Sequence, residues 1–435
     1  MNDLPKILII GAVPFDPSSQ SRSYESFLGK WENTDDRIRQ IYSRPVHPGS
    51  GLCKFYFQIT DKMLINRFFK KTTNVGREIV IENKENNINC DKGIEREKKS
   101  FLYSFFRQRK SSLVKLLRKL LWSKKRWASK ELLDWTDSFN PDLIYLCLSN
   151  DFFINEMAMY FSLRYNIPIV TVIGDDYYYN SHFSFSPFYY LYRTLYKRMF
   201  RKLFSMNIGL LYNSEKLKDK YKEEFKNIND TIYISSNLDR QKNIKTGKKI
   251  VYAGNLELGR YKSLISFGKV ANKFGFEIDV YSPQPKRKIL SKMSKISCLK
   301  YCGSLNYSEL ISKIYDANYL LIMESFSKKD IPFTRYSLST KVADYLATSI
   351  PIIAYGPYES GCIKYLTDNQ CSVSCTDKTS LEKVLFNLSN KNVNLYKISE
   401  KENIVFETNH TKKRNNEIFY QFVRKLLESK HENKR

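Results

Sequence analysis

Short apolar runs alternate with helical spacing in the first part of the chain. Residues 6–13, 142–148 and 167–173 are largely apolar runs, and the apolar positions of 152–165 between them are spaced as in a helix. Runs of this length are typical of strands that are buried on both faces of a parallel sheet. The pattern therefore predicts a β-α-β alternation.

The same alternation returns in the second part, after a polar stretch at 235–248 that we interpret as a linker. The apolar runs predict strands at 249–253, 276–281, 299–302, 319–323 and 351–355. The segments between them predict helices at 260–274, 308–316 and 339–348. Alternation over both parts predicts an α/β protein with two doubly wound, Rossmann-like domains, at 1–235 and 236–408.

Residues 101–130 interrupt this pattern with ten Lys or Arg and no acid. Apolar positions repeat there at helical spacing, at Leu113, Leu116, Leu117, Leu120 and Leu121. Basic side chains occupy the other side, at Lys115, Arg118 and Lys119. The segment is predicted to form a basic amphipathic insertion in the first domain. Its leucines either face the core or lie on an anionic membrane surface, and the residues of 189–204 leave the same two alternatives.

Composition narrows the class of protein. With 42% hydrophobic and 14% aromatic residues, the 435-residue chain has enough apolar material for two folded domains. Its net charge of +27 favours anionic partners such as a polyanion, an anionic membrane or phosphorylated substrates. The start of the chain lacks a signal-peptide pattern, and no apolar stretch reaches the roughly 18 residues of a spanning helix. We therefore expect a cytoplasmic protein, peripheral to the inner face of the membrane, whose eight cysteines are reduced.

The segment 336–357 holds residue types that suit a phosphate. Ser339 and Thr340 are good caps for the predicted helix, and a helix N-terminus with hydroxyls and free N–H groups binds anions. Lys341 adds a positive charge at the same end. Asp344, one turn further on, is placed to accept hydrogen bonds from ribose hydroxyls. The alternative is a capped helix without a ligand.

A second anion-binding loop follows the strand predicted at 249–253. Gly254 and Asn255 leave the strand, and Arg260 and Lys262 open the next helix. Glycine lets the backbone approach a ligand, and cationic side chains bind phosphate oxygens. Two anion sites in one parallel domain favour a nucleoside diphosphate, bound where such sheets bind ligands, at the carboxyl ends of the strands.

Two adjacent carboxylates, Asp175 and Asp176, follow the strand predicted at 167–173, where they would face the cleft between the domains. A carboxylate there suits a general base or a contact to an acceptor hydroxyl. The alternative is a pair of turn aspartates that cap the next segment. His182 is a further candidate nearby. No His or carboxylate spacing indicates a bound metal, so we predict neither a metal nor another cofactor.

The second part resembles the donor domain of the group-one, retaining glycosyltransferases with the GT-B fold, over about 235–380. The likeness is to enzymes of bacterial capsule, lipopolysaccharide and exopolysaccharide synthesis. In that family a G-R-L-x-x-x-K loop binds the donor diphosphate, and Gly254, Asn255 and Arg260 stand at its Gly, Arg and Lys positions. Asp344 matches the second acidic residue of the family, which contacts the ribose, and Tyr336 stands where its first glutamate is usual.

The resemblance implies further site residues. Glu324, which follows a predicted strand, is expected to reach the donor pocket as a catalytic carboxylate. Ser304 lies in a turn that is similar to the one that packs near the base. Gly11 and the loop 14–23, which includes Phe15, resemble the acceptor-side loop of the family.

The resemblance also implies an architecture and an activity. Two Rossmann-like domains would face a cleft, and a C-terminal helix within 409–435 would pack back on the first domain. The expected activity is transfer of a sugar, with retention, from a nucleoside diphosphate sugar to a lipid-linked or growing bacterial surface polysaccharide, or to an oligosaccharide. Helix dipoles and cations would hold the diphosphate without a metal ion.

Two other functions stay open. The basic charge and the aromatic-basic stretches suit a nucleic-acid-binding protein, but no nucleic-acid motif is present and we predict no such partner. A non-catalytic GT-B-like scaffold is the other alternative, because Asn255 and Tyr336 replace charged residues of the family pattern.

Overall fold

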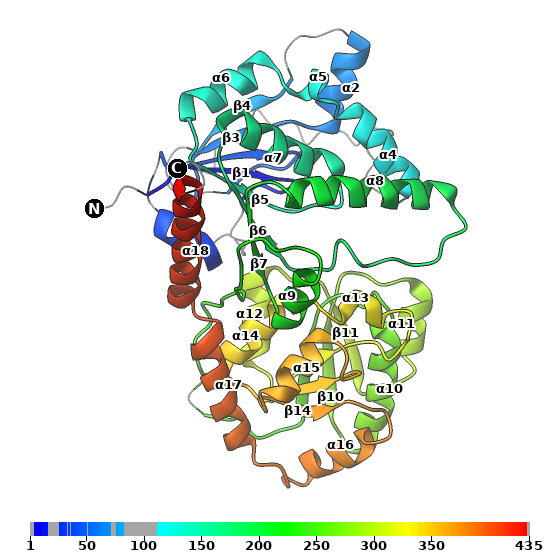
Figure 1. Ribbon diagram of the computed structural model, residues 1–435. Coiled ribbons are helices and arrows are strands. Elements are labelled where there is room, and N and C mark those ends of the chain that lie inside the picture. The colour runs from blue at the N-terminus through cyan, green and yellow to red at the C-terminus, as the bar shows by residue number, and fades with distance from the viewer. Residues whose placement is uncertain are drawn as a thin grey trace.

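The computed structural model describes residues 4–15, 26–32, 34, 36–49, 51–70, 75–81, 111–241 and 243–432. These residues form two α/β domains, each built on a sheet with helices on both faces (Figure 1). The start of the predicted basic insertion, 101–110, and most of the loop 14–23 lie outside the described residues.

The first domain contains an eight-stranded sheet in the order β4-β3-β2-β1-β5-β6-β7-β8. All neighbouring strands are parallel except β3 and β4, which are antiparallel. The strands are β1 (Ile7–Gly11), β2 (Ile38–Tyr42), β3 (Phe55–Gln58), β4 (Arg77–Val80), β5 (Leu143–Leu146), β6 (Ile169–Ile173), β7 (Ile208–Tyr212) and β8 (Asn229–Thr231). Every residue of β1, β5 and β7 is buried, as expected for a sheet that helices cover on both faces.

Alternate residues of the strands face two separate cores. Leu8 and Ile10 of β1 pack with one group of helices, whereas Ile7 and Ile9 pack against the C-terminal helix α18 (Lys412–Glu432). A segment from the end of the chain therefore completes the first domain. The other helical elements of this domain are η1 (Gly29–Trp31), α2 (Asp61–Lys70), α4 (Ser112–Leu121), α5 (Lys124–Trp127), α6 (Lys130–Phe139), α7 (Phe152–Tyr165), α8 (Pro187–Phe204) and α9 (Glu215–Lys222).

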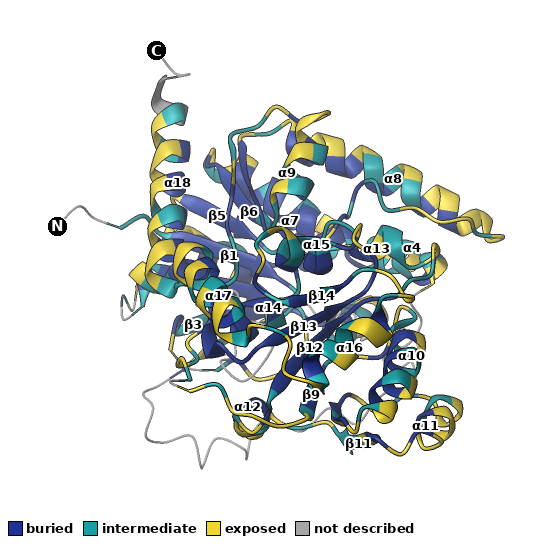
Figure 2. Ribbon diagram, turned by 90° about the horizontal axis from the view of Figure 1, so that it is seen from below, coloured by how far each residue is buried: buried dark blue, intermediate teal, exposed yellow. Residues whose placement is uncertain are grey.

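The second domain contains a six-stranded parallel sheet in the order β11-β10-β9-β12-β13-β14. Its strands are β9 (Lys249–Ala253), β10 (Glu277–Tyr281), β11 (Leu299–Gly303), β12 (Tyr319–Met323), β13 (Ile352–Tyr355) and β14 (Val373–Cys375). Its helices are α10 (Arg260–Lys273), α11 (Arg287–Met293), α12 (Tyr307–Tyr315), α13 (Ile331–Thr334), α14 (Thr340–Thr348), α15 (Gly361–Asp368), α16 (Leu381–Ser389) and α17 (Leu395–Asn409). Figure 2 shows the strands buried and the outer faces of the helices exposed. The strand order reverses between β9 and β12, so the prediction of doubly wound α/β domains is confirmed.

The basic amphipathic helix forms as α4, but its leucines do not all face the core. Leu113, Leu117 and Leu120 are exposed, and only part of the leucine stripe packs on the core. The guanidinium of Arg118 instead points into the domain, where it bonds Asp151 at 2.7 Å and Asp61 at 3.2 Å. The basic side of α4 therefore contacts the protein, together with part of the leucine stripe. No helix in the described part of the chain is long and apolar enough to cross a membrane.

The segment that leads into α14 lies against the first domain. The Ser337 hydroxyl donates to Asp175 at 2.6 Å, and the Ser214 hydroxyl donates to the carbonyl of Tyr336 at 2.8 Å. The amide of Asn213 donates to the carbonyl of Leu338 at 3.3 Å. The start of α14 is thus the part of the second domain that is coupled directly to the first.

Candidate functional site

The site lies at the carboxyl ends of β9 and β12, where the strand order of the second sheet reverses. Arg260 is the first residue of α10, which follows β9, and Glu324 directly follows β12. In open parallel sheets this reversal opens a crevice between the loops, and ligands bind there. The topology alone therefore brings these two distant residues to the ligand-binding edge of the sheet.

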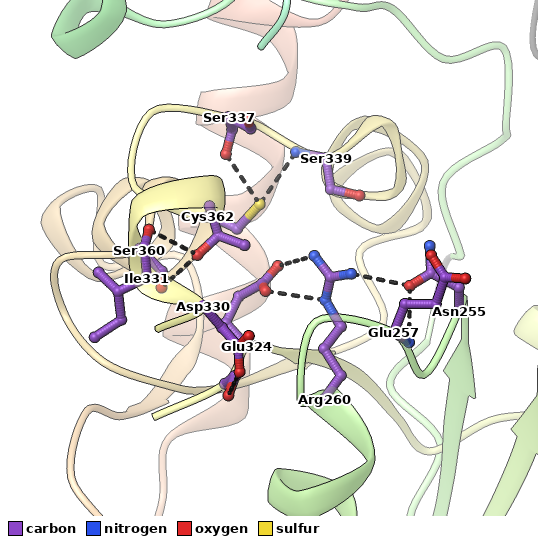
Figure 3. Close-up of polar contacts among 12 residues, drawn as sticks. Asn255, Glu257, Arg260, Glu324, Asp330, Ile331, Ser337, Ser339, Ser360 and Cys362 are labelled. Carbon is purple, nitrogen blue, oxygen red and sulfur yellow. Dashed lines mark hydrogen bonds and ion pairs between the residues drawn. The ribbon is translucent and has the colours of Figure 1, made fainter. Parts of the chain in front are cut away.

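Arg260 and Glu324 form a buried, two-pronged ion pair (Figure 3). The guanidinium Nε and Nη2 donate to the two carboxylate oxygens at 2.9 Å and 3.0 Å. Its Nη1 donates to Oδ1 of Asn255 at 3.0 Å. A guanidinium has five N–H groups, and these bonds use three of them. Two N–H groups of Arg260 therefore remain for a ligand.

Lys341 adds a second cation to the same cluster. A Cβ at Gly254 would lie 2.3 Å from the Lys341 ammonium, so a side chain there would displace the lysine. Burial, and then the nearby charge of Arg260, lower the pKa of Lys341 to about 8, whereas Glu324 acts to raise it. Two cations thus surround one carboxylate, and the cluster has an excess positive charge.

The amino end of α14 faces this cluster without a capping side chain. Ser339 is the N-cap residue, but its hydroxyl makes no capping bond, and its backbone N–H donates to the Cys362 sulfur at 3.1 Å (Figure 3). Burial raises the pKa of this thiol to about 12, so it stays neutral. Thr340, the next residue, is exposed. The sequence analysis missed Cys362, because a lone cysteine gives no signal of such a contact.

Two predicted donor residues lie in other surroundings. Asp344 is buried and accepts a hydrogen bond from the hydroxyl of Ser236 at 2.6 Å. Tyr336 lies at the contact between the domains, with its ring 4.7 Å from the Arg335 guanidinium and partly buried against the first domain. Neither side chain takes part in the hydrogen bonds of Arg260.

Two more predicted donor residues are exposed. Ser304 follows β11, an edge strand that is separated from β9 by β10. Lys262 lines a groove on α10 and α11 together with Lys269. Neither side chain takes part in the Arg260–Glu324 ion pair.

On the first domain, Asp175 and Asp176 follow β6 but differ in their surroundings. Asp175 is exposed and accepts the hydrogen bond from Ser337 of the second domain. Asp176 is buried, and its Oδ1 accepts from the N–H of Tyr179 at 2.8 Å and from the hydroxyl of Tyr221 at 3.1 Å. Asp176 therefore stabilises the turn, as the alternative interpretation expected, while its Oδ2 is buried and lacks a partner.

A cavity of about 420 Å³ lies beside Asp176. Its lining includes Asp176, Asn180 and Arg193, and each of these residues has one buried side-chain atom without a hydrogen-bond partner: Oδ2, Oδ1 and Nε. The exposed ring of His182 also lines it, as does Phe333 of the second domain. Because buried polar atoms normally have partners, this cavity suits a ligand with both donor and acceptor groups.

The acceptor-side residues Gly11 and Phe15 lie elsewhere, at the carboxyl end of β1. Phe15 is buried, and its N–H donates to the Gln40 side chain at 3.0 Å. Neither residue lines the cavity beside Asp176. Within the described residues, no group of three or more His, Cys, Asp or Glu side chains is arranged to hold a metal ion.

Comparison with known proteins identifies the fold. No protein-family model and no curated protein matches the chain. Among solved structures, HepE of Anabaena in complex with UDP and glucose is 10% identical and matches over 97% of this chain and 100% of its own, with a TM-score of 0.60. Sucrose-phosphate synthase of Thermosynechococcus elongatus is 9% identical and matches over 98% of this chain and 100% of its own, with a TM-score of 0.60. A glycosyltransferase of Rickettsia africae is 12% identical and matches over 96% of this chain and 99% of its own, with a TM-score of 0.51. The chain thus has the two-domain GT-B fold that the sequence predicted.

Proposed function

We propose that the protein is a glycosyltransferase that moves a sugar from a nucleoside diphosphate sugar to an acceptor hydroxyl. The observation that carries this proposal is the pair of cations, Arg260 and Lys341, beside Glu324 at the strand-order reversal of the second sheet. A diphosphate is the ligand class that such an excess of positive charge favours. Support comes from HepE, which shares the fold and was solved with UDP-glucose.

The same groups explain how the chemistry would be assisted. As the bond between sugar and diphosphate breaks, negative charge grows on the leaving phosphate. The two remaining N–H groups of Arg260, the Lys341 ammonium and the uncapped N–H groups of α14 would stabilise that charge. Glu324 would act as a positioning residue, because its carboxylate is engaged by Arg260 on both oxygens.

The cavity beside Asp176 is the proposed acceptor site. A sugar hydroxyl both donates and accepts hydrogen bonds, so hydroxyls would satisfy Asp176 and Asn180 as donors and Arg193 as an acceptor. Asp176 is then the proposed contact for the reacting hydroxyl. We propose as acceptor a lipid-linked or growing bacterial surface glycan. Retention of configuration, and independence from a metal, remain part of this proposal.

Nucleotide-sugar binding tests the function. We expect at least one member of a panel of UDP, GDP and TDP sugars to raise the melting temperature of the protein. Arg260→Gln should abolish that shift, whereas Lys262→Gln, a matched change in the neighbouring groove, should preserve it. Absence of any shift, together with tight and salt-sensitive binding of DNA, would overturn the proposal in favour of a nucleic-acid-binding protein.

A further inference from the structure

Helix α4 presents its apolar side to solvent. Leu113, Leu117 and Leu120 form one stripe at spacings of four and three residues, and Leu120 is 67% exposed. The charges of α4 are used inside the molecule: Arg118 bonds Asp61 and Asp151, and Lys119 pairs with Glu156. This helix therefore exposes leucines where a soluble surface helix would expose its charges.

Exposed apolar side chains also lie on the neighbouring helix and on the loop before it. Helix α8 packs beside α4, and α8 with the loop before it forms the side of the molecule that projects to the right in Figures 1 and 2. Phe183 and Phe185 of this loop are 75% and 94% exposed. The leucine-phenylalanine face consists of Leu113, Leu117, Leu120, Phe183, Phe185, Phe188 and Leu191. Exposed apolar groups that gather in this way mark an interaction surface.

The surroundings of this face are basic. Residues 111–130 hold seven Lys or Arg and residues 177–204 hold five, and neither segment contains Asp or Glu. On the same side of the molecule, α10 and α11 of the second domain form a groove of about 670 Å³ (Figure 1). Four lysines line it, and none of the described residues in its lining is acidic. They are Lys262, Lys269, Lys292 and Lys295.

We propose that this side of the molecule docks on the surface of an anionic lipid bilayer. The leucine-phenylalanine face inserts its side chains below the headgroups, and the lysine groove contacts anionic headgroups. Docking on an anionic bilayer uses both the exposed apolar side chains and the cations around them. A soluble acidic partner would use only the cations. The proposal does not depend on sugar transfer.

Docking also orients the cavity beside Asp176. The cavity is lined by Ser112 and Lys115 of α4, by Ser184 of the loop and by Tyr189 of α8, the same elements that carry the face. A glycan that is attached to a lipid would therefore meet the cavity at the edge of the bilayer. This step rests on the proposed function, and it favours a lipid-linked acceptor.

Flotation of the full chain with vesicles tests the docking. The probes are vesicles of phosphatidylcholine alone and of phosphatidylcholine with phosphatidylglycerol. We expect binding that is strongest to the anionic vesicles, and at least about tenfold weaker for the triple variant Leu117→Ser, Leu120→Ser, Phe185→Ser. The control is Tyr396→Ser with Ile404→Ser, which removes two other exposed apolar side chains, on α17, and should bind like the wild type.

A second variant tests the groove. Lys292→Gln with Lys295→Gln should weaken binding to the anionic vesicles and flatten its dependence on salt. Equal binding of the triple variant and the wild type, or no vesicle binding by the wild type, would overturn the proposal. So would a wild-type dimer that the triple variant converts to a monomer, because the face would then be a contact between copies. A nucleotide-sugar shift in the melting temperature, measured on the same variants, separates loss of docking from failure of the proposed function or of folding.

Discussion

At the scale of single residues, Glu324 decides how Arg260 can meet a ligand. The carboxylate occupies two N–H groups of the guanidinium and fixes its plane, while Asn255 occupies a third. Both side chains of the ion pair are largely shielded from water. Removal of one partner alone therefore has a structural cost as well as a functional one.

A double-mutant comparison separates these two effects. Arg260→Gln should lower the free energy of unfolding by about 3 kcal/mol, because it leaves the Glu324 charge buried without its partner. Arg260→Gln with Glu324→Gln should recover most of that stability but not the binding of a nucleotide sugar. Urea unfolding measures the first quantity and a thermal shift measures the second. Recovery of binding in the double variant would contradict the role given to Arg260.

Lys341 predicts a pH dependence of donor binding. Its pKa of about 8 means that the ammonium loses its proton as the pH rises through 8. A bound diphosphate favours the protonated form, so affinity should be constant below pH 8 and fall above it. Calorimetric titration between pH 6.5 and pH 9.5 measures the affinity. Above pH 8, each further pH unit should lower the affinity by up to about tenfold. Lys341→Gln should bind more weakly and lose the dependence on pH, and an unchanged profile in that variant would assign the titration to another group.

At the scale of elements, α4 shows what a helical pattern alone leaves undetermined. Spacing establishes that leucines and basic residues occupy opposite sides, but not which side is buried. That choice depends on Asp61 at the start of α2 and Asp151 before α7, which receive Arg118. These partners are distant in sequence, so the orientation of α4 could not be predicted from its own residues.

The orientation of α4 makes Arg118 a structural residue. Arg118→Gln should lower the free energy of unfolding by about 3 kcal/mol, because two carboxylates lose their cation in a partly buried site. Lys125→Gln, an exposed change in the following helix α5, is the matched control and should have little effect. Urea unfolding of both variants measures the difference. Equal stability of the two would show that the basic side of α4 faces solvent.

At the scale of the whole molecule, the sequence predicted the architecture. The apolar runs at 249–253 and 319–323 became β9 and β12 with those limits, because buried parallel strands need continuous apolar residues. The place of Arg260 in the candidate site could be predicted, because it follows such a strand. The hydrogen bond of Asp344 could not, because its partner Ser236 lies 108 residues earlier in the sequence. Contacts across long separations in sequence therefore limited the prediction of the site.

The junction of the two domains contains a buried histidine. His410 joins α17 of the second domain to α18, which packs on the first. Its ring bonds the carbonyl of Ile234 at 2.8 Å and the hydroxyl of Tyr365 at 2.9 Å. Burial is the largest cause that lowers its pKa from 6.5 to about 4. Between about pH 4 and pH 6.5 the ring is therefore neutral in the folded protein, whereas a histidine in the unfolded chain binds a proton.

This difference predicts a loss of stability in acid. Above pH 6.5 His410 binds no proton in either the folded or the unfolded state, and its full contribution to stability is present. Between pH 6.5 and pH 4 only the unfolded state binds the proton. The free energy of unfolding therefore decreases as the pH is lowered through this window. The total loss is about 3 kcal/mol. In urea unfolding at several pH values, the stability difference between the wild type and His410→Gln should shrink as the pH falls through this window. His182→Gln, which changes an exposed ring, should follow the wild type, and a constant difference for His410→Gln would exclude the junction as the acid-sensitive element.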